Sequence, residues 1–135
     1  MPLGRLTPRS LPTVAFAIPG QCDNTHDCAV GAGDRFLART VPRLLRALGP
    51  HGYLVVTWDE GVTDAGCCGG SHGGGIATTV LGPDVRPGAR DDTPVDHYGV
   101  LRTIEDSLRL SRLGDARFAR HGGLDGLFVR PPVVR

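Results

Sequence analysis

Two adjacent acids, Asp59 and Glu60, are the residues of this chain best suited to chemistry. They follow the apolar run 53–56 and precede Gly61, so a buried strand is expected to run into a glycine-rich loop here. In open α/β sheets, ligands bind in the crevice beyond the carboxyl ends of the strands. Carboxylate oxygens there suit a divalent cation, because the cation replaces the hydration that they lose. The alternative is an ordinary strand end, with Asp59 capping a turn and Glu60 solvated.

A second polar group occupies the loop 21–28, which also follows an expected strand. Its histidine, His26, could ligate a metal, contact phosphate oxygens or donate a proton to a leaving group. If the two strands are neighbours, His26 and the acid pair face the same crevice. The alternative is a surface loop of Asx-turns, in which Cys22 and Cys28 form a local disulfide staple.

Four cysteines allow three full disulfide pairings, which the sequence leaves open. A bond between Cys22 and Cys28 is sterically easy and would imply an oxidising compartment, whereas the neighbours Cys67 and Cys68 are not expected to bond to each other. The competing interpretation is a structural zinc site, although the spacings differ from those of common zinc modules. Its candidate ligands are Cys22, His26, Cys28, Cys67, Cys68 and His72.

Other polar residues carry weaker signals. His97, in the motif 96–98 at the expected start of a helix, could point toward the crevice or merely decorate a first turn. His51 and His121 have no acid or cysteine cluster beside them and are expected at the surface. Ser71 lacks the strand-to-helix elbow of a serine nucleophile. The loop 61–75 lacks a phosphate-binding glycine pattern, so a flexible connector is expected.

The composition describes a globular chain of 135 residues, with 40% hydrophobic and 21% charged residues. Its fifteen Arg residues are scattered among fourteen acids and the net charge is +1, so no basic face for nucleic acid is expected. No apolar stretch approaches the ~20 residues of a membrane span. We expect residues 1–10 to be a disordered segment without a convincing export signal, and 131–135 to be a tail.

The order of elements indicates the α/β class with at least one parallel crossover. The apolar patterns predict strands over Leu11–Pro19, Tyr53–Asp59 and Ile76–Leu81, and a short last strand over 127–129. A helical pattern opens at Asp34, should be kinked or split by Pro42, and stops at Gly49-Pro50. Asp96 is the expected N-cap of a second helix. Its expected inner face consists of Tyr98, Leu101, Ile104, Leu108 and Leu110.

Four blocks together resemble the bacterial phosphoesterase family of phospholipase C and acid phosphatase type. These blocks are 26–28 (HDC), 57–61 (TWDEG), 76–83 (IATTVLGP) and 96–106 (DHYGVLRTIED). The similarity runs from about Leu11 to about Gly114, and the last block is the most specific. The family belongs to the alkaline phosphatase-like superfamily. The resemblance therefore implies part of an α/β/α sandwich with a mostly parallel sheet, formed by residues 11–130 as the C-terminal half of a phosphoesterase domain.

The resemblance implies hydrolysis of phosphate esters at a divalent metal cation of unknown identity, by way of a phosphorylated Ser or Thr. Asp59 and Glu60 match the paired acids that ligate the metal. His26 matches the histidine that contacts phosphate or protonates the leaving group, and Asp27 would orient it. Asp23 and His97 are candidates for side chains that contact the metal-ligating residues rather than the cation itself. The expected substrate is a phosphate-ester small molecule or a phospholipid head group.

The chain departs from the family pattern, because the family's N-terminal half supplies further metal ligands and the nucleophile. The sequence therefore predicts a fragment that is inactive alone and that pairs with a complementing N-terminal half or with a second copy. The family resemblance implies a secreted or periplasmic protein. The alternative function is a non-catalytic module stabilised by zinc or disulfides through its Cys and His residues.

Overall fold

The computed structural model describes residues 11–132. The predicted disordered segment 1–10 and the last three residues of the predicted tail lie outside the described residues. The chain divides into two compact units, Met1–Leu54 and Val55–Arg135, and each is described by itself. No helix in the described part of the chain is both long and apolar enough to cross a membrane.

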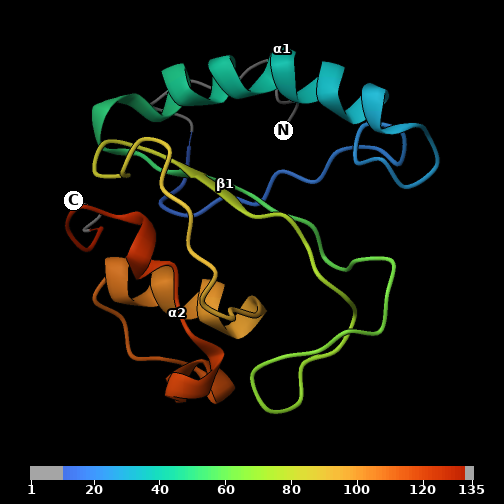
Figure 1. Ribbon diagram of the computed structural model, residues 1–135. Coiled ribbons are helices and arrows are strands. Elements are labelled where there is room, and N and C mark those ends of the chain that lie inside the picture. The colour runs from blue at the N-terminus through green and yellow to red at the C-terminus, as the bar shows by residue number, and fades with distance from the viewer. Residues whose placement is uncertain (1–10, 133–135) are drawn as a thin grey trace. The chain divides into compact units, whose positions relative to one another are not determined.

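The first unit is built on one long helix, α1, which spans Val30–Leu48 (Figure 1). It begins four residues before the predicted start at Asp34. Pro42 removes one backbone donor from its interior, yet the helix continues through it, so the predicted split is absent. The helix ends where Gly49-Pro50 predicts, because Gly49 adopts a φ of 69°, which favours glycine. A 3₁₀ helix, η2, follows at Gly49–His51.

The predicted strand over Leu11–Pro19 is wrong. The segment holds no strand, and Val14, Phe16 and Ile18 are exposed by 41%, 84% and 86%. These three residues alternate, so in an extended chain they share one face. A strand needs a neighbouring backbone to pair with, and none pairs with this segment within residues 11–132. The apolar alternation indicates which side chains would share one face of a strand, but it does not show whether a second strand pairs with the segment.

The described residues form one small sheet, which consists of β1 (Leu54–Val56) and β2 (Thr79–Leu81). The predicted mixed α/β class is confirmed, but the predicted mostly parallel sheet is wrong, because these strands are antiparallel. Parallel strands need a crossover, usually through a helix. The segment between β1 and β2 instead doubles back on itself without a helix. Each strand is also shorter than predicted and keeps only part of its apolar run.

The glycine-rich loop 61–75 is an ordered hairpin and not the expected flexible connector. The Gly61 N–H donates to the Gly73 carbonyl at 2.6 Å, and the Gly74 N–H donates to the Ala65 carbonyl at 2.9 Å. A bridge between Cys67 and Ser71 closes the tip. Glycine is required because the two arms run so close: a Cβ on Gly61 would lie 2.5 Å from a carbonyl oxygen of the opposite arm.

The second helix, α2, spans His97–Ser107. Asp96 is its N-cap, as predicted, and its Oδ1 accepts a hydrogen bond from the Gly99 N–H at 3.0 Å. The predicted apolar inner face is wrong in part, since Tyr98 and Leu110 are 44% and 57% exposed. The side chains and backbone positions that are buried on α2 are small or polar. They are Gly99, Thr103, Glu105 and Ser107.

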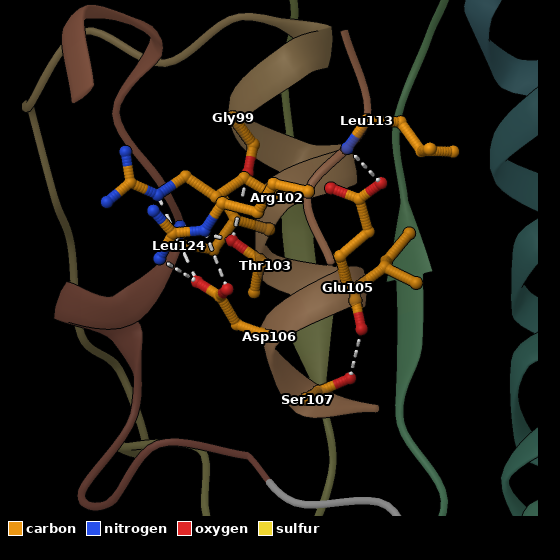
Figure 2. A network of polar contacts seen from close by, with 10 residues as sticks. Gly99, Arg102, Thr103, Glu105, Asp106, Ser107, Leu113 and Leu124 are labelled. Carbon is orange, nitrogen blue, oxygen red and sulfur yellow. Dashed lines mark hydrogen bonds and ion pairs between the residues drawn. The ribbon is translucent and has the colours of Figure 1, made fainter. Parts of the chain in front are cut away.

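Polar contacts hold the C-terminal segment to α2, which explains this buried polar face (Figure 2). The Thr103 hydroxyl donates to the Gly99 carbonyl at 3.0 Å and accepts from the Leu124 N–H at 2.9 Å. Glu105, only 3% exposed, accepts from the Leu113 N–H at 3.0 Å. The N–H groups of Leu113 and Leu124, which lie beyond the end of α2, are thereby satisfied by side chains of the helix.

Three short 3₁₀ helices complete the second unit. They are η3 (Gly114–Arg117), η4 (Ala119–His121) and η5 (Asp125–Leu127). The predicted last strand over 127–129 is reduced to a single bridge between Val85 and Phe128. The buried apolar residues of this unit are Val80, Ala116, Leu124 and Phe128.

A buried polar cluster lies at the start of α2. The Asp96 Oδ2 accepts hydrogen bonds from the Ser71 hydroxyl and from the His121 Nδ1. His121 was expected at the surface, but it is 4% exposed. Its carbonyl also accepts from the Asp96 N–H at 3.4 Å, and it lies so close to Gly99 that a side chain there would clash. We call Ser71, Asp96 and His121 the α2 cluster.

Asp96 is held in its ionised form by this cluster. Burial opposes ionisation, but hydrogen bonds from Ser71, His121 and the Gly99 N–H outweigh it, so the pKa of Asp96 lies below its ordinary value. An ionised Asp96 can only accept, so the Nδ1 of His121 carries the proton. Its Nε2 is buried and has no hydrogen-bond partner in the described part of the chain.

We expect Thr103→Val to lower the free energy of unfolding by about 1–3 kcal/mol, because it leaves the buried Leu124 N–H without an acceptor at nearly constant side-chain volume. Urea unfolding of both proteins would measure this difference. Thr79→Val, an exposed position of β2, is the matched control and should change stability little. Equal effects of the two substitutions would contradict the role assigned to Thr103.

The depressed pKa of Asp96 predicts a specific loss of stability in acid. Such a carboxyl stabilises the fold above its unfolded pKa, about 3.9 for Asp, and the contribution is lost as the pH falls through the native pKa. We therefore expect the free energy of unfolding to fall below about pH 4. The fall should be smaller in Asp96→Asn. Urea unfolding over that range would measure it, and Asp92→Asn, an exposed carboxyl, should follow the unchanged chain.

Candidate functional site

The acid pair lies just beyond β1, at the base of the glycine hairpin. Asp59 and Glu60 are both exposed. Within residues 11–132, neither carboxylate forms a hydrogen bond or an ion pair. Two adjacent carboxylates without a cationic partner repel each other, and a bound cation would relieve that repulsion. The position after the strand is the one that the sequence predicted.

His97 holds the backbone of the acid pair. Its Nε2 lies 2.8 Å from the Asp59 carbonyl oxygen, so the ring donates a hydrogen bond to the backbone and leaves both carboxylates unoccupied. The sequence suggested that His97 could reach this region, and the structure brings it to the main chain of Asp59. The contact spans 38 positions in sequence.

His26 and Asp27 form a pair in the first unit. The His26 Nδ1 lies 2.7 Å from the Asp27 Oδ1, and the side chains are 67% and 58% exposed. An exposed pair of this kind adds little to stability. It does fix the orientation of the ring, because an ionised Asp27 accepts the proton on Nδ1. His26 and the acid pair belong to different units, so the shared crevice stays a prediction.

The loop that carries His26 is locally constrained. Cys22 is paired with Cys28 in a disulfide, the His26 N–H donates to the Asn24 Oδ1 at 2.9 Å, and Asp23 is half-buried. Cys67 is paired with its neighbour Cys68, contrary to expectation. Both residues lie in the tight tip of the hairpin, which the sequence does not show.

The donor set of the acid pair fits a hard divalent cation. Mg²⁺, Mn²⁺ and Ca²⁺ prefer oxygen ligands, and carboxylates without protein partners can supply them. Within residues 11–132, no group of three or more His, Cys, Asp or Glu side chains gathers closely enough to hold a metal. Asp59 and Glu60 can therefore supply two ligands, and the rest of the shell would come from water, substrate or other polypeptide.

Sequence reasoning missed the α2 cluster. The sequence suggests for Ser71 only the role of a nucleophile, and it predicts His121 at the surface because no acid or cysteine cluster lies beside it. Its partner Asp96 is 25 positions away. The one available signal was Asp96 itself, since an N-cap carboxylate has a second oxygen that a buried donor can use.

Comparison with known proteins places these residues in a family. The Phosphoesterase family matches residues 5–111. A protein of Mycobacterium tuberculosis (strain ATCC 25618 / H37Rv), named phosphatidylinositol-3-phosphatase, is 37% identical over 107 residues, which are 78% of this chain and 33% of that protein. The chain thus spans about a third of the length of this relative. No solved structure matches this chain. Since the matched range covers most of the sequence and includes the acid pair, His26 and the start of α2, the chain belongs to the Phosphoesterase family.

Proposed function

We propose that the chain supplies part of the site of a metal-dependent phosphoric ester hydrolase. Asp59 and Glu60 hold the cation, and His26, oriented by Asp27, protonates the leaving oxygen. The observation that carries this proposal is the acid pair: two exposed carboxylates without a protein partner, on a constrained backbone, within the range that matches the family. When bound, the cation polarises a phosphoryl oxygen and offsets its developing charge.

The histidine acts through its second ring nitrogen. Nδ1 lies against Asp27, and we propose that Nε2 is the ring atom that meets a substrate oxygen. A protonated ring donates that proton as the ester bond breaks, which matters most when the leaving alkoxide is strongly basic. The exposure of the ring lets it exchange protons with water between turnovers.

The substrate class that we propose is a phosphate ester of a phospholipid head group, with phosphoinositides as the first candidates. The support is the relative, whose name describes phosphatase action on a 3-phosphorylated phosphatidylinositol. A small phosphomonoester would present the same phosphate to the acid pair, so the two substrates share one chemistry.

We propose that the nucleophile comes from polypeptide corresponding to the other two-thirds of the relative. The segment Val14–Ile18 supports this arrangement, because its exposed side chains alternate as in a strand and no strand pairs with it within residues 11–132. A strand of that polypeptide would cover Phe16 and Ile18 and pair with the backbone of this segment. A second copy of this chain is the competing partner.

A second candidate function is a non-catalytic module stabilised by disulfides. The observation that favours it is the pairing of all four cysteines, which leaves no thiolate for zinc. Such pairing also supports our proposal of a secreted or periplasmic location, because disulfides persist in oxidising compartments. Labelling with a thiol reagent distinguishes the states: paired cysteines stay unlabelled until a reductant is added, whereas zinc-bound cysteines become reactive after chelation.

The proposed metal role predicts the behaviour of a chimera in which this chain replaces the matching region of the mycobacterial relative. We expect phosphate release from phosphatidylinositol 3-phosphate that a chelator abolishes and Mn²⁺ or Mg²⁺ restores. Asp59→Asn should lower turnover by several orders of magnitude, because a cation ligand is lost. Asp64→Asn, an exposed acid on the same loop, is the matched control.

A small effect in the same chimera would contradict the metal role of Asp59. An effect of Asp59→Asn within about threefold would remove Asp59 from the metal site, since loss of even an indirect metal contact costs about 10–100-fold.

The isolated chain should release no p-nitrophenol from p-nitrophenyl phosphate with any divalent metal. Turnover by the isolated chain would place the nucleophile within its own 135 residues.

The proposed proton-donor role predicts a dependence on the leaving group. In the chimera, His26→Ala should slow hydrolysis of an alkyl phosphate far more than that of p-nitrophenyl phosphate, because nitrophenolate leaves without protonation. The rate constants of both substrates would be compared at one pH. His51→Ala, an exposed histidine of the same unit, should leave both rates unchanged. Equal losses on both substrates would exclude proton donation by His26.

A further inference from the structure

The start of α2 contacts both ends of the glycine hairpin. His97 binds the Asp59 carbonyl oxygen at the base of the hairpin, and Asp96 binds the Ser71 hydroxyl at its tip. Two consecutive residues of one helix terminus therefore reach sites twelve positions apart in the loop. His121 holds Asp96 from the opposite side through its ring and its carbonyl.

The hairpin transmits these two contacts to the acid pair. Its arms are joined by the bonds from Gly61 to Gly73 and from Gly74 to Ala65, and its tip is closed by the bridge between Cys67 and Ser71. Gly61 directly follows Glu60, so these bonds connect the tip of the hairpin to the backbone of the acid pair. The side chains of the pair have no partner of their own in the described part of the chain, so only the backbone positions them.

We propose that His97 and the α2 cluster form a two-point clamp that positions the Asp59 and Glu60 carboxylates for the cation. This inference rests on the proposed metal site. His97 and Ser71 are positioning residues: neither meets substrate or metal, and each acts through the backbone of the hairpin. Asp96 serves both the helix and the clamp, because its Oδ1 caps α2 while its Oδ2 accepts from Ser71 and His121.

The burial of the cluster distinguishes the clamp from a surface contact. The side chains of Asp96 and His121 are 8% and 5% exposed, so their hydrogen bonds do not compete with water. His97 is exposed, and its bond to Asp59 would be weak alone. The cluster holds the helix terminus in place, so that His97 meets the Asp59 carbonyl without a further loss of backbone freedom.

The test uses the full chain and two readouts. Hydrogen exchange at the Gly61 and Gly74 amides, followed by NMR, reports on the hairpin, and Mn²⁺ titration followed by EPR reports on the acid pair. We expect Ser71→Ala and His97→Ala to speed exchange at both amides at least about tenfold and to weaken Mn²⁺ binding by about tenfold. Thermal unfolding should change little, because α2 keeps its cap.

Matched variants separate positioning from general damage. Ser111→Ala, an exposed serine of the same unit, should change neither readout. His97→Gln should keep both the exchange rates and the Mn²⁺ affinity near those of the unsubstituted chain, because the Gln amide can donate to the Asp59 carbonyl in place of the ring. Asp59→Asn should abolish the Mn²⁺ signal, which assigns the signal to the acid pair.

The outcomes separate the clamp from the proposed function. Unchanged exchange in both Ser71→Ala and His97→Ala would overturn the clamp, as would unchanged Mn²⁺ affinity in chains whose hairpin exchanges faster. No Mn²⁺ binding by the unsubstituted chain would overturn the metal site, and the exchange rates alone would then decide whether the clamp holds the hairpin.

Discussion

The second unit depends on one buried carboxylate. Asp96 accepts hydrogen bonds from a helix N–H, a loop hydroxyl and a ring nitrogen that come from three different parts of the chain. A buried carboxylate is unfavourable unless it is paired, and these donors together offset the cost of burying it. The helix start, the tip of the glycine hairpin and the 3₁₀ segment that ends at His121 are thereby fixed together.

The parts of the fold that could be predicted depend on local chemistry. Asp96 is a cap because a short acceptor before an amphipathic run satisfies the first free N–H groups, and Gly49 stops α1 because it tolerates a positive φ. The acid pair was found in the same way, from its position after an apolar run. For His97, the sequence suggests only that the side chain could point toward the crevice, because the N-cap at Asp96 fixes where the first turn begins.

The parts that could not be predicted depend on partners distant in sequence. His121 is buried because Asp96 needs a donor, and nothing within several residues of His121 reveals that need. The segment 11–19 has the apolar alternation of a strand, but pairing is a property of two segments. The prediction of a parallel sheet is wrong for a related reason. The glycines that allow the hairpin to fold tightly also let β1 and β2 meet without a crossover.

These hydrogen bonds constrain the backbone of an acid pair whose side chains have no partner within residues 11–132. In a flexible loop, Asp59 and Glu60 would separate to reduce their repulsion, and cation binding would have to overcome the cost of bringing them back. Under the proposed metal role, the hairpin and the helix terminus would bear that cost during folding, so a cation would meet carboxylates whose backbone is already ordered. By mass action, a cation bound there would then stabilise the folded state that positions its ligands. The proposed metal role therefore predicts that cation binding and folding of the second unit are coupled through the same few hydrogen bonds.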